Sequence, residues 1–170
     1  MAYMPPWMET AKSFIGIKEY RGSSNNLTIL RWAKIVGGWT ASYYKRDSIP
    51  WCGLFVAICL IQNGIKPTPE ALRAKAWAKW SGGKRLREPC FGCILVFSRR
   101  GGGHVGFYVS EDKHYFHVLG GNQSDAVNVK KISKSRHIAS VWPKGKEWEK
   151  FYQKGRIYKR FSGKVSHNEA

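Results

Sequence analysis

Residues 48–64 read SIPWCGLFVAICLIQNG, and this stretch decides the fold. Pro50 suits a bend that leads into a helix, and the pair Asn63-Gly64 is a typical helix end. The residues between them are apolar on nearly every side, which predicts a helix buried in the middle of a domain. The run is shorter than the roughly 20 residues that cross a bilayer, so we expect a core helix rather than a membrane span.

Cys52 lies in the first turn of this predicted helix. The unpaired backbone N–H groups and the positive end of the helix dipole at that place favour a thiolate, which is how proteins obtain a sulfur nucleophile at neutral pH. The other interpretation is that Cys52 is a small core residue, as free cysteines often are. The segment alone leaves both interpretations open.

The composition fits one domain with a polyanionic partner. The chain has 170 residues, of which 43% are hydrophobic and 14% aromatic, enough for a substantial core. Lys and Arg number 29 against 11 Asp and Glu, a formal net charge of +18. Such a balance predicts binding to nucleic acid, anionic lipid or an acidic cell-wall polymer, and charge alone does not choose among them.

The cysteines are expected to be reduced and mostly buried. Cys52 and Cys59 would stand about two turns apart on one helix, too far to bridge each other. Cys90 and Cys93 form a CxxC with no second pair and no histidine pair at zinc-finger spacing, so we expect no metal and no cofactor. Residues 1–7 lack the pattern of a secretory signal, so we expect synthesis in a cytosol and release by another agent.

The first half of the chain carries helical patterns and the second half strand patterns. Helices are expected over residues 7–15, 27–36 and 71–80, with Asn26 capping the second, and residues 39–47 form a tyrosine-rich lead-in to the central helix. Helices followed by a meander of strands predict an α+β domain. The expected strands are residues 93–97, 104–109, 114–119, 127–132 and 138–142.

Residues 144–170 differ from the rest in composition. They hold eight Lys and Arg against three Glu, interleaved with aromatic residues, and residues 147–152 fit a short helix. We therefore expect a domain over residues 1–143 followed by a tail. This tail is either a basic arm for an anionic surface or an end that packs its aromatic side chains back on the domain.

A cysteine nucleophile needs a base and a polar group that orients the base. His104 opens a strand directly after a Gly-rich turn, where a side chain can face a cleft, and it is the best candidate of the five histidines. His114 and His117 point to opposite faces of one strand, while His137 and His167 sit in basic, loop-like surroundings. The other interpretation of His104 is a histidine at a surface strand end.

The orienting group should come from the strand beside His104. Asn122 follows the third expected strand and is well placed if the two strands pair through the short turn between them. An amide oxygen can fix an imidazole tautomer as a carboxylate does. Gln123 is adjacent, but strand alternation predicts that it faces the other side. The other interpretation of Asn122 is a turn residue after Gly120-Gly121.

Three motifs in this order resemble those of the CHAP/NlpC-type cysteine peptidoglycan hydrolases, most closely the small endolysins of bacteriophages. They are PWCGLFV at residues 50–56, GGHVGFYV at 102–109 and LGGNQSDAV at 119–127, and the pattern over residues 6–29 is similar to the same branch. Two positions depart from the pattern. Gly53 stands where many relatives have Ala or Ser, and Asn122 falls where many have Glu.

The resemblance implies a papain-like fold, with the Cys52 helix packed on an antiparallel sheet that carries His104 and Asn122 as the other catalytic residues. It also implies hydrolysis of amide bonds in the peptide part of peptidoglycan by a Cys-His thiolate mechanism without a metal. The backbone N–H of Cys52 is expected to hold the oxyanion, together with a hydroxyl from Tyr43 or Tyr44. Trp51 and Gln123 are expected to complete the substrate-binding set.

The same resemblance implies a monomer that stays in the host bacterial cytoplasm until a holin-like partner opens the way to the periplasm and cell wall. The basic surface would concentrate it on anionic wall polymer or on the outer membrane. An N-acetylmuramoyl-L-alanine amidase would use the same residues as an endopeptidase, so both remain open. A virion-associated wall-degrading part and a basic nucleic-acid-binding module are two further interpretations, although no DNA- or RNA-binding motif is present.

Overall fold

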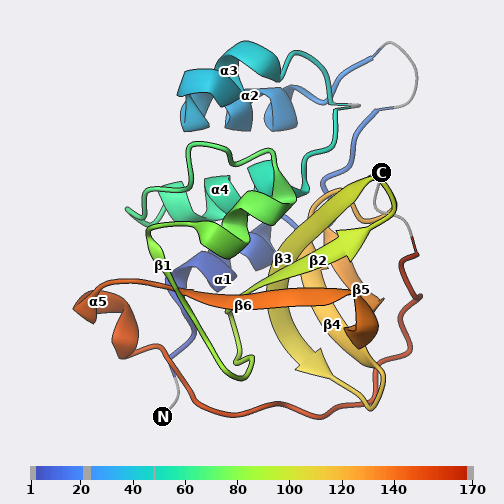
Figure 1. Cartoon of the computed structure of the whole chain (residues 1–170). Helices are drawn as coiled ribbons and strands as arrows, with labels where there is room; N and C mark the ends of the chain where they lie inside the picture. Colours follow the sequence, from blue (N-terminus) through green and yellow to red (C-terminus); the bar gives the residue numbers. More distant parts are fainter. Residues whose placement is uncertain (1–2, 21–23, 48, 168–170) are drawn as a thin grey trace.

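The computed structural model describes residues 3–20, 24–47 and 49–167, and it is built on one antiparallel sheet (Figure 1). The six strands lie in the order β1-β6-β2-β3-β4-β5, so the chain first forms an up-and-down meander and then returns β6 to the other side of β2. Every neighbouring pair is antiparallel. The strands are β1 (Gly83–Arg85), β2 (Ile94–Arg99), β3 (Gly102–Glu111), β4 (Tyr115–Gly120), β5 (Asn128–Ser133) and β6 (His137–Pro143).

Most helices precede the sheet in the chain, and two short helical segments, η2 (Lys134–Arg136) and α5 (Lys146–Glu149), come later. This arrangement confirms the predicted α+β class. The α-helices are α1 (Pro6–Ser13), α2 (Leu27–Val36), α3 (Gly38–Tyr43), α4 (Cys52–Ile61) and α5 (Lys146–Glu149), and the 3₁₀ helices are η1 (Ala74–Lys79) and η2 (Lys134–Arg136). None of the helices within the described residues is long and apolar enough to cross a membrane.

Helix α4 forms the centre of the core, as its apolar sequence predicts. Every residue from Cys52 to Leu60 is buried, because α1, α2 and β3 all pack on the helix, and Figure 1 shows α4 between α2 and α1. The predicted cap of α2 is also present, since the side-chain oxygen of Asn26 accepts the backbone N–H of Thr28 at 2.9 Å. This packing holds the first turn of α4 against the middle of the sheet.

One local prediction is incomplete and another is wrong. Residues 39–47 are not only a lead-in, because α3 occupies their first part. The α-helix predicted over residues 71–80 is replaced by η1. The Ala71 carbonyl accepts the indole N–H of Trp77 at 3.0 Å, whereas in an α-helix it would accept the backbone N–H of Lys75. A side-chain donor therefore competes with the helical hydrogen bond at the start of this segment.

The tail packs back on the domain. Glu111 of β3 exchanges backbone hydrogen bonds with Ile157 and Lys159, and Lys131 of β5 does the same with Lys164 and Ser166. These contacts favour the second of the two interpretations of the tail for residues up to 167. Two further contacts hold the tail: Arg156 Nη1 donates to both carboxylate oxygens of Glu111 at 3.1 and 3.2 Å, and Trp148 packs edge-on against Trp7 with ring centroids 5.7 Å apart.

Candidate active site

Cys52 begins α4, as predicted, at a helix N-terminus without a side-chain cap among the described residues. Trp51 precedes the helix, and its carbonyl accepts the backbone N–H of Phe55 at 3.0 Å. The N–H groups of the first turn, those of Cys52, Gly53 and Leu54, therefore point out of the helix start without helical acceptors. A thiolate or an oxyanion at this place gains from these donors and from the helix dipole.

Gly53 is required by the packing around this helix start. A Cβ added to it would overlap the backbone carbonyl of Ala71 and would lie 3.3 Å from Nε1 of Trp77. The segment between α4 and η1 thus crosses directly over the first turn of α4. The departure from Ala or Ser at this position has a local cause, because the crossing segment takes the space that a methyl group would fill.

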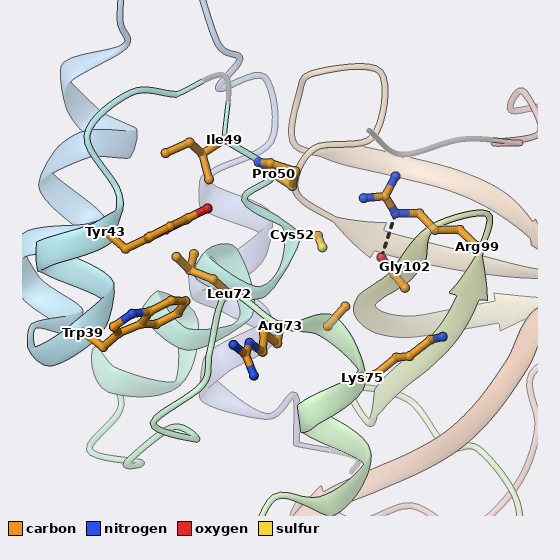
Figure 2. Close-up of a pocket in the computed structure, with 12 residues that line it drawn as sticks. Trp39, Tyr43, Ile49, Pro50, Cys52, Leu72, Arg73, Lys75, Arg99 and Gly102 are labelled. Atoms are coloured by element: carbon orange, nitrogen blue, oxygen red, sulfur yellow. Dashed lines mark hydrogen bonds between the residues drawn. The ribbon is translucent and has the colours of Figure 1, made fainter.

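Cys52 lines a pocket of about 530 Å³. One wall comes from α3, a second from the segment around η1, and a third from the β2–β3 turn (Figure 2). Cys52 itself is 4% exposed, so its sulfur reaches the pocket while most of the side chain is covered. The lining residues are Trp39, Tyr43, Ile49, Pro50, Cys52, Leu72, Arg73, Ala74, Lys75, Arg99, Gly102 and Gly103.

His104 follows Gly102 and Gly103 at the start of β3, so the strand that lines the pocket also carries the predicted base. The histidine is fully buried, pairs with Phe97 of β2 and stacks on its ring with centroids 6.3 Å apart. Because β3 packs against α4, the residues predicted as nucleophile and base come from two elements in direct contact.

The ring of His104 is oriented by Gln123, whose Oε1 lies 2.9 Å from Nε2 of the histidine. The amide nitrogen of Gln123 donates to the carbonyl oxygens of Val118 at 3.1 Å and Asn128 at 2.8 Å, which fixes Oε1 as the atom facing His104. Nε2 of His104 must therefore carry the hydrogen and donate it. In the neutral imidazole, Nδ1 is then the nitrogen that can accept a proton.

The prediction that Gln123 faces away from His104 is wrong. Gln123 occupies the place that was expected for Asn122. Strand alternation ends with β4 at Gly120, because Asn122, Ser124 and Asp125 all adopt left-handed backbone conformations, with φ of 57°, 55° and 61°. Asn122 is buried within this turn. The turn rotates the chain so that the second amide, not the first, reaches Nε2 of His104.

The two glycines before Asn122 bring this turn close to His104 and to α4. A Cβ on Gly120 would lie 2.6 Å from Oε1 of Gln123 and 3.3 Å from Nε2 of His104. A Cβ on Gly121 would lie 2.7 Å from Cβ of Phe55 on α4. Side chains at these positions would overlap Gln123 and Phe55, so the two glycines allow the close approach of this turn.

The other residues predicted to bind substrate lie in different places. Tyr43 lines the Cys52 pocket and is half exposed, whereas Trp51 is fully buried and donates its indole N–H to Glu19 Oε2 at 3.0 Å. Tyr44 lines a separate pocket beside α2, and burial raises the pKa of its hydroxyl. The structure therefore places Cys52 and Tyr43 on one pocket, with His104 on the strand whose start lines this pocket and Gln123 hydrogen-bonded to His104. Trp51 and Tyr44 lie outside the lining of this pocket.

Sequence reasoning missed the charged residues of the pocket, Arg73, Lys75 and Arg99. Arg99 stands next to the Gly-rich turn before His104, which was an available signal, but Arg73 and Lys75 lie in the segment that was predicted as an α-helix. Within the described residues, no three His, Cys, Asp or Glu side chains are grouped so as to hold a metal ion. Comparisons with protein-family models, with curated proteins and with solved structures found no match to this chain.

Proposed function

We propose that the protein is a cysteine hydrolase with a papain-like arrangement that cleaves amide bonds of bacterial peptidoglycan. One observation carries the proposal: Cys52, at the N-terminus of α4, lines a pocket whose wall includes the start of the strand that carries His104, and Gln123 orients this histidine. Peptidoglycan as the substrate rests on the resemblance of the three motifs and on the net charge of +18, which suits an anionic wall polymer.

In the proposed reaction, Nδ1 of His104 takes the proton of the Cys52 thiol, and the thiolate attacks the carbonyl carbon of the amide. The first-turn N–H groups of α4 stabilise the oxyanion. They take the place of the Tyr44 hydroxyl that was expected to help hold it. His104 then protonates the leaving amine and afterwards removes a proton from the water that hydrolyses the thioester. Gln123 holds Nε2–H throughout, so that the histidine keeps the correct tautomer and orientation.

Cys59 provides a matched comparison for Cys52. Both cysteines lie on α4, but Cys59 is fully buried, and burial raises the pKa of its thiol well above the usual range. A fully buried thiol of this kind is a poor nucleophile. Cys59→Ala should therefore keep activity, whereas Cys52→Ala should abolish it and leave the fold intact.

The test is mass spectrometry of purified peptidoglycan digested by the wild type, Cys52→Ala and Cys59→Ala. New free amines between stem-peptide residues identify an endopeptidase, and peptides released from lactyl groups identify an amidase. Digestion by Cys52→Ala would refute the mechanism, and the absence of products from the wild type would refute peptidoglycan as the substrate. In the cell, we propose that the monomeric enzyme reaches the wall only after another protein opens the membrane.

A further inference from the structure

The pocket beside Cys52 has a strong charge of one sign. Arg73, Lys75 and Arg99 line it, and none of the described residues that line it is acidic. A concave site with three cations and no anion concentrates negative ligands and orients their charged groups. We therefore expect the substrate segment that binds here to be anionic.

The three cations are held in place by backbone and ring contacts. Arg99 Nε donates to the Gly103 carbonyl at 2.9 Å, and the Lys75 stem packs over the same residue, since a Cβ on Gly103 would lie 2.9 Å from Lys75 Cγ. The guanidinium of Arg73 lies 5.9 Å from the centre of the Trp39 ring. Side chains held in this way lose less freedom on binding a ligand.

Arg73 also pairs with Glu70 at 3.0 Å, but both side chains are more than half exposed. Ion pairs in this setting contribute little, so a ligand carboxylate can replace Glu70. Beside Arg73, Trp39 stacks on Tyr43 with ring centroids 5.0 Å apart and gives the pocket an aromatic wall. The site therefore offers charge on one side and a flat apolar surface on the other.

The charged ends of the three side chains stand apart around Cys52 rather than converging on one point (Figure 2). A single compact phosphate would need converging donors, whereas carboxylates spaced along a peptide fit separate cations. We propose that this pocket binds free carboxylates of an acidic peptide on the substrate, through Arg73, Lys75 and Arg99. This inference rests on the proposed function. It means that the enzyme prefers stem peptides with free carboxylates over stem peptides whose carboxylates are amidated.

The test compares two synthetic stem peptides that differ only in whether their side carboxylates are free or amidated. We expect the wild-type kcat/KM to be about tenfold or more higher for the free acid, because hydrogen bonds between charged groups are stronger than those to a neutral amide. Arg73→Gln, Lys75→Gln and Arg99→Gln should each reduce this ratio. The control variants are Lys79→Gln, on the exposed side of η1, and Arg100→Gln, next to Arg99. Each removes one positive charge outside the pocket lining and should leave the ratio of the two kcat/KM values unchanged.

Binding to Cys52→Ala, measured by calorimetry, separates the failure of this inference from failure of the proposed function. Equal cleavage of both peptides by the wild type would overturn the carboxylate preference and leave the hydrolase intact. If neither peptide is cleaved, tighter binding of the free acid still supports the pocket's role, and equal or absent binding overturns it. Tighter binding of a short single-stranded oligonucleotide, lost in the same three Gln variants, would overturn it in favour of a nucleic-acid ligand.

Discussion

Replacing Gln123 by Met tests the orientation of His104 most directly. Met has a similar length but offers neither the oxygen that accepts Nε2–H of His104 nor the nitrogen that donates to the Val118 and Asn128 carbonyls. All of these contacts are buried or partly buried, and each buried polar group left unpaired costs roughly 1–3 kcal/mol. We expect the free energy of unfolding to fall by about 2–4 kcal/mol, which a domain of ordinary stability survives.

The catalytic effect of Gln123→Met follows from the same contact. Without the acceptor, His104 loses its fixed tautomer and orientation, and the loss of one hydrogen bond to a group that becomes charged during the reaction is worth about 1.5–3 kcal/mol. At about 1.4 kcal/mol for each factor of ten, kcat/KM should fall roughly 10- to 100-fold. Urea unfolding and steady-state cleavage of a stem peptide measure the two effects separately.

The matched control is Asn122→Gly. Asn122 adopts a left-handed conformation with φ of 57°, which Gly adopts without strain, so this variant should keep the backbone of the turn. Loss of the buried side chain should lower the free energy of unfolding, while most of the activity remains. If Asn122→Gly loses activity and Gln123→Met keeps it, then Asn122 orients the histidine during catalysis. That result would refute the assignment of Gln123.

Two further predictions concern stability. Gly53→Ala should lower the free energy of unfolding by about 1–3 kcal/mol and reduce activity, because the new methyl group overlaps the Ala71 carbonyl over the start of α4; a melting curve and a cleavage assay check this. Burial raises the pKa of Asp112, but hydrogen bonds from His117 and two backbone N–H groups lower it more, to about 2. The stabilisation by Asp112 is therefore present above its unfolded pKa of 3.8 and is lost as the pH falls through 2. Because Asp112 lies close to solvent, which screens its interactions, Asp112→Asn should remove about 1 kcal/mol of acid sensitivity in urea unfolding at pH 2 to 5.

The sequence was sufficient where a local pattern also decides the packing. Helix α4 is apolar all round and is buried all round, and α2 has both an apolar face and its Asn26 cap. The strand pairing that places His104 next to the β4 end follows from the short turn between β3 and β4. These features depend on residues close together in the chain, so a single sequence contains the information.

The sequence was insufficient where residues far apart compete for one group. The indole of Trp77 takes the Ala71 carbonyl from the predicted helix, and the carbonyl then fills the space beside Gly53. In the same way, the alternation argument for Gln123 failed because three left-handed residues follow Gly120, and nothing in the strand pattern predicts how a turn of this kind rotates the next side chain. Both failures lie at the candidate site, where the backbone departs from regular structure.

A second array in the protein shows why hydrogen-bond geometry alone does not identify an active site. Ser110 Oγ lies 2.7 Å from Nδ1 of His117, and Nε2 of His117 lies 2.9 Å from Asp112 Oδ2. The sequence of groups, serine, histidine and carboxylate, is that of a serine nucleophile with its base, but the two ring nitrogens are exchanged. The tail covers this array, since Phe161 packs on the His117 ring at 5.0 Å and the neighbouring residues of the tail hydrogen-bond to β3 and β5. Cys52 differs in facing a pocket of about 530 Å³ from a helix N-terminus, which supplies both access for a substrate and donors for an oxyanion. We therefore assign the Ser110 array to anchoring of the tail, and we keep Cys52 as the proposed nucleophile.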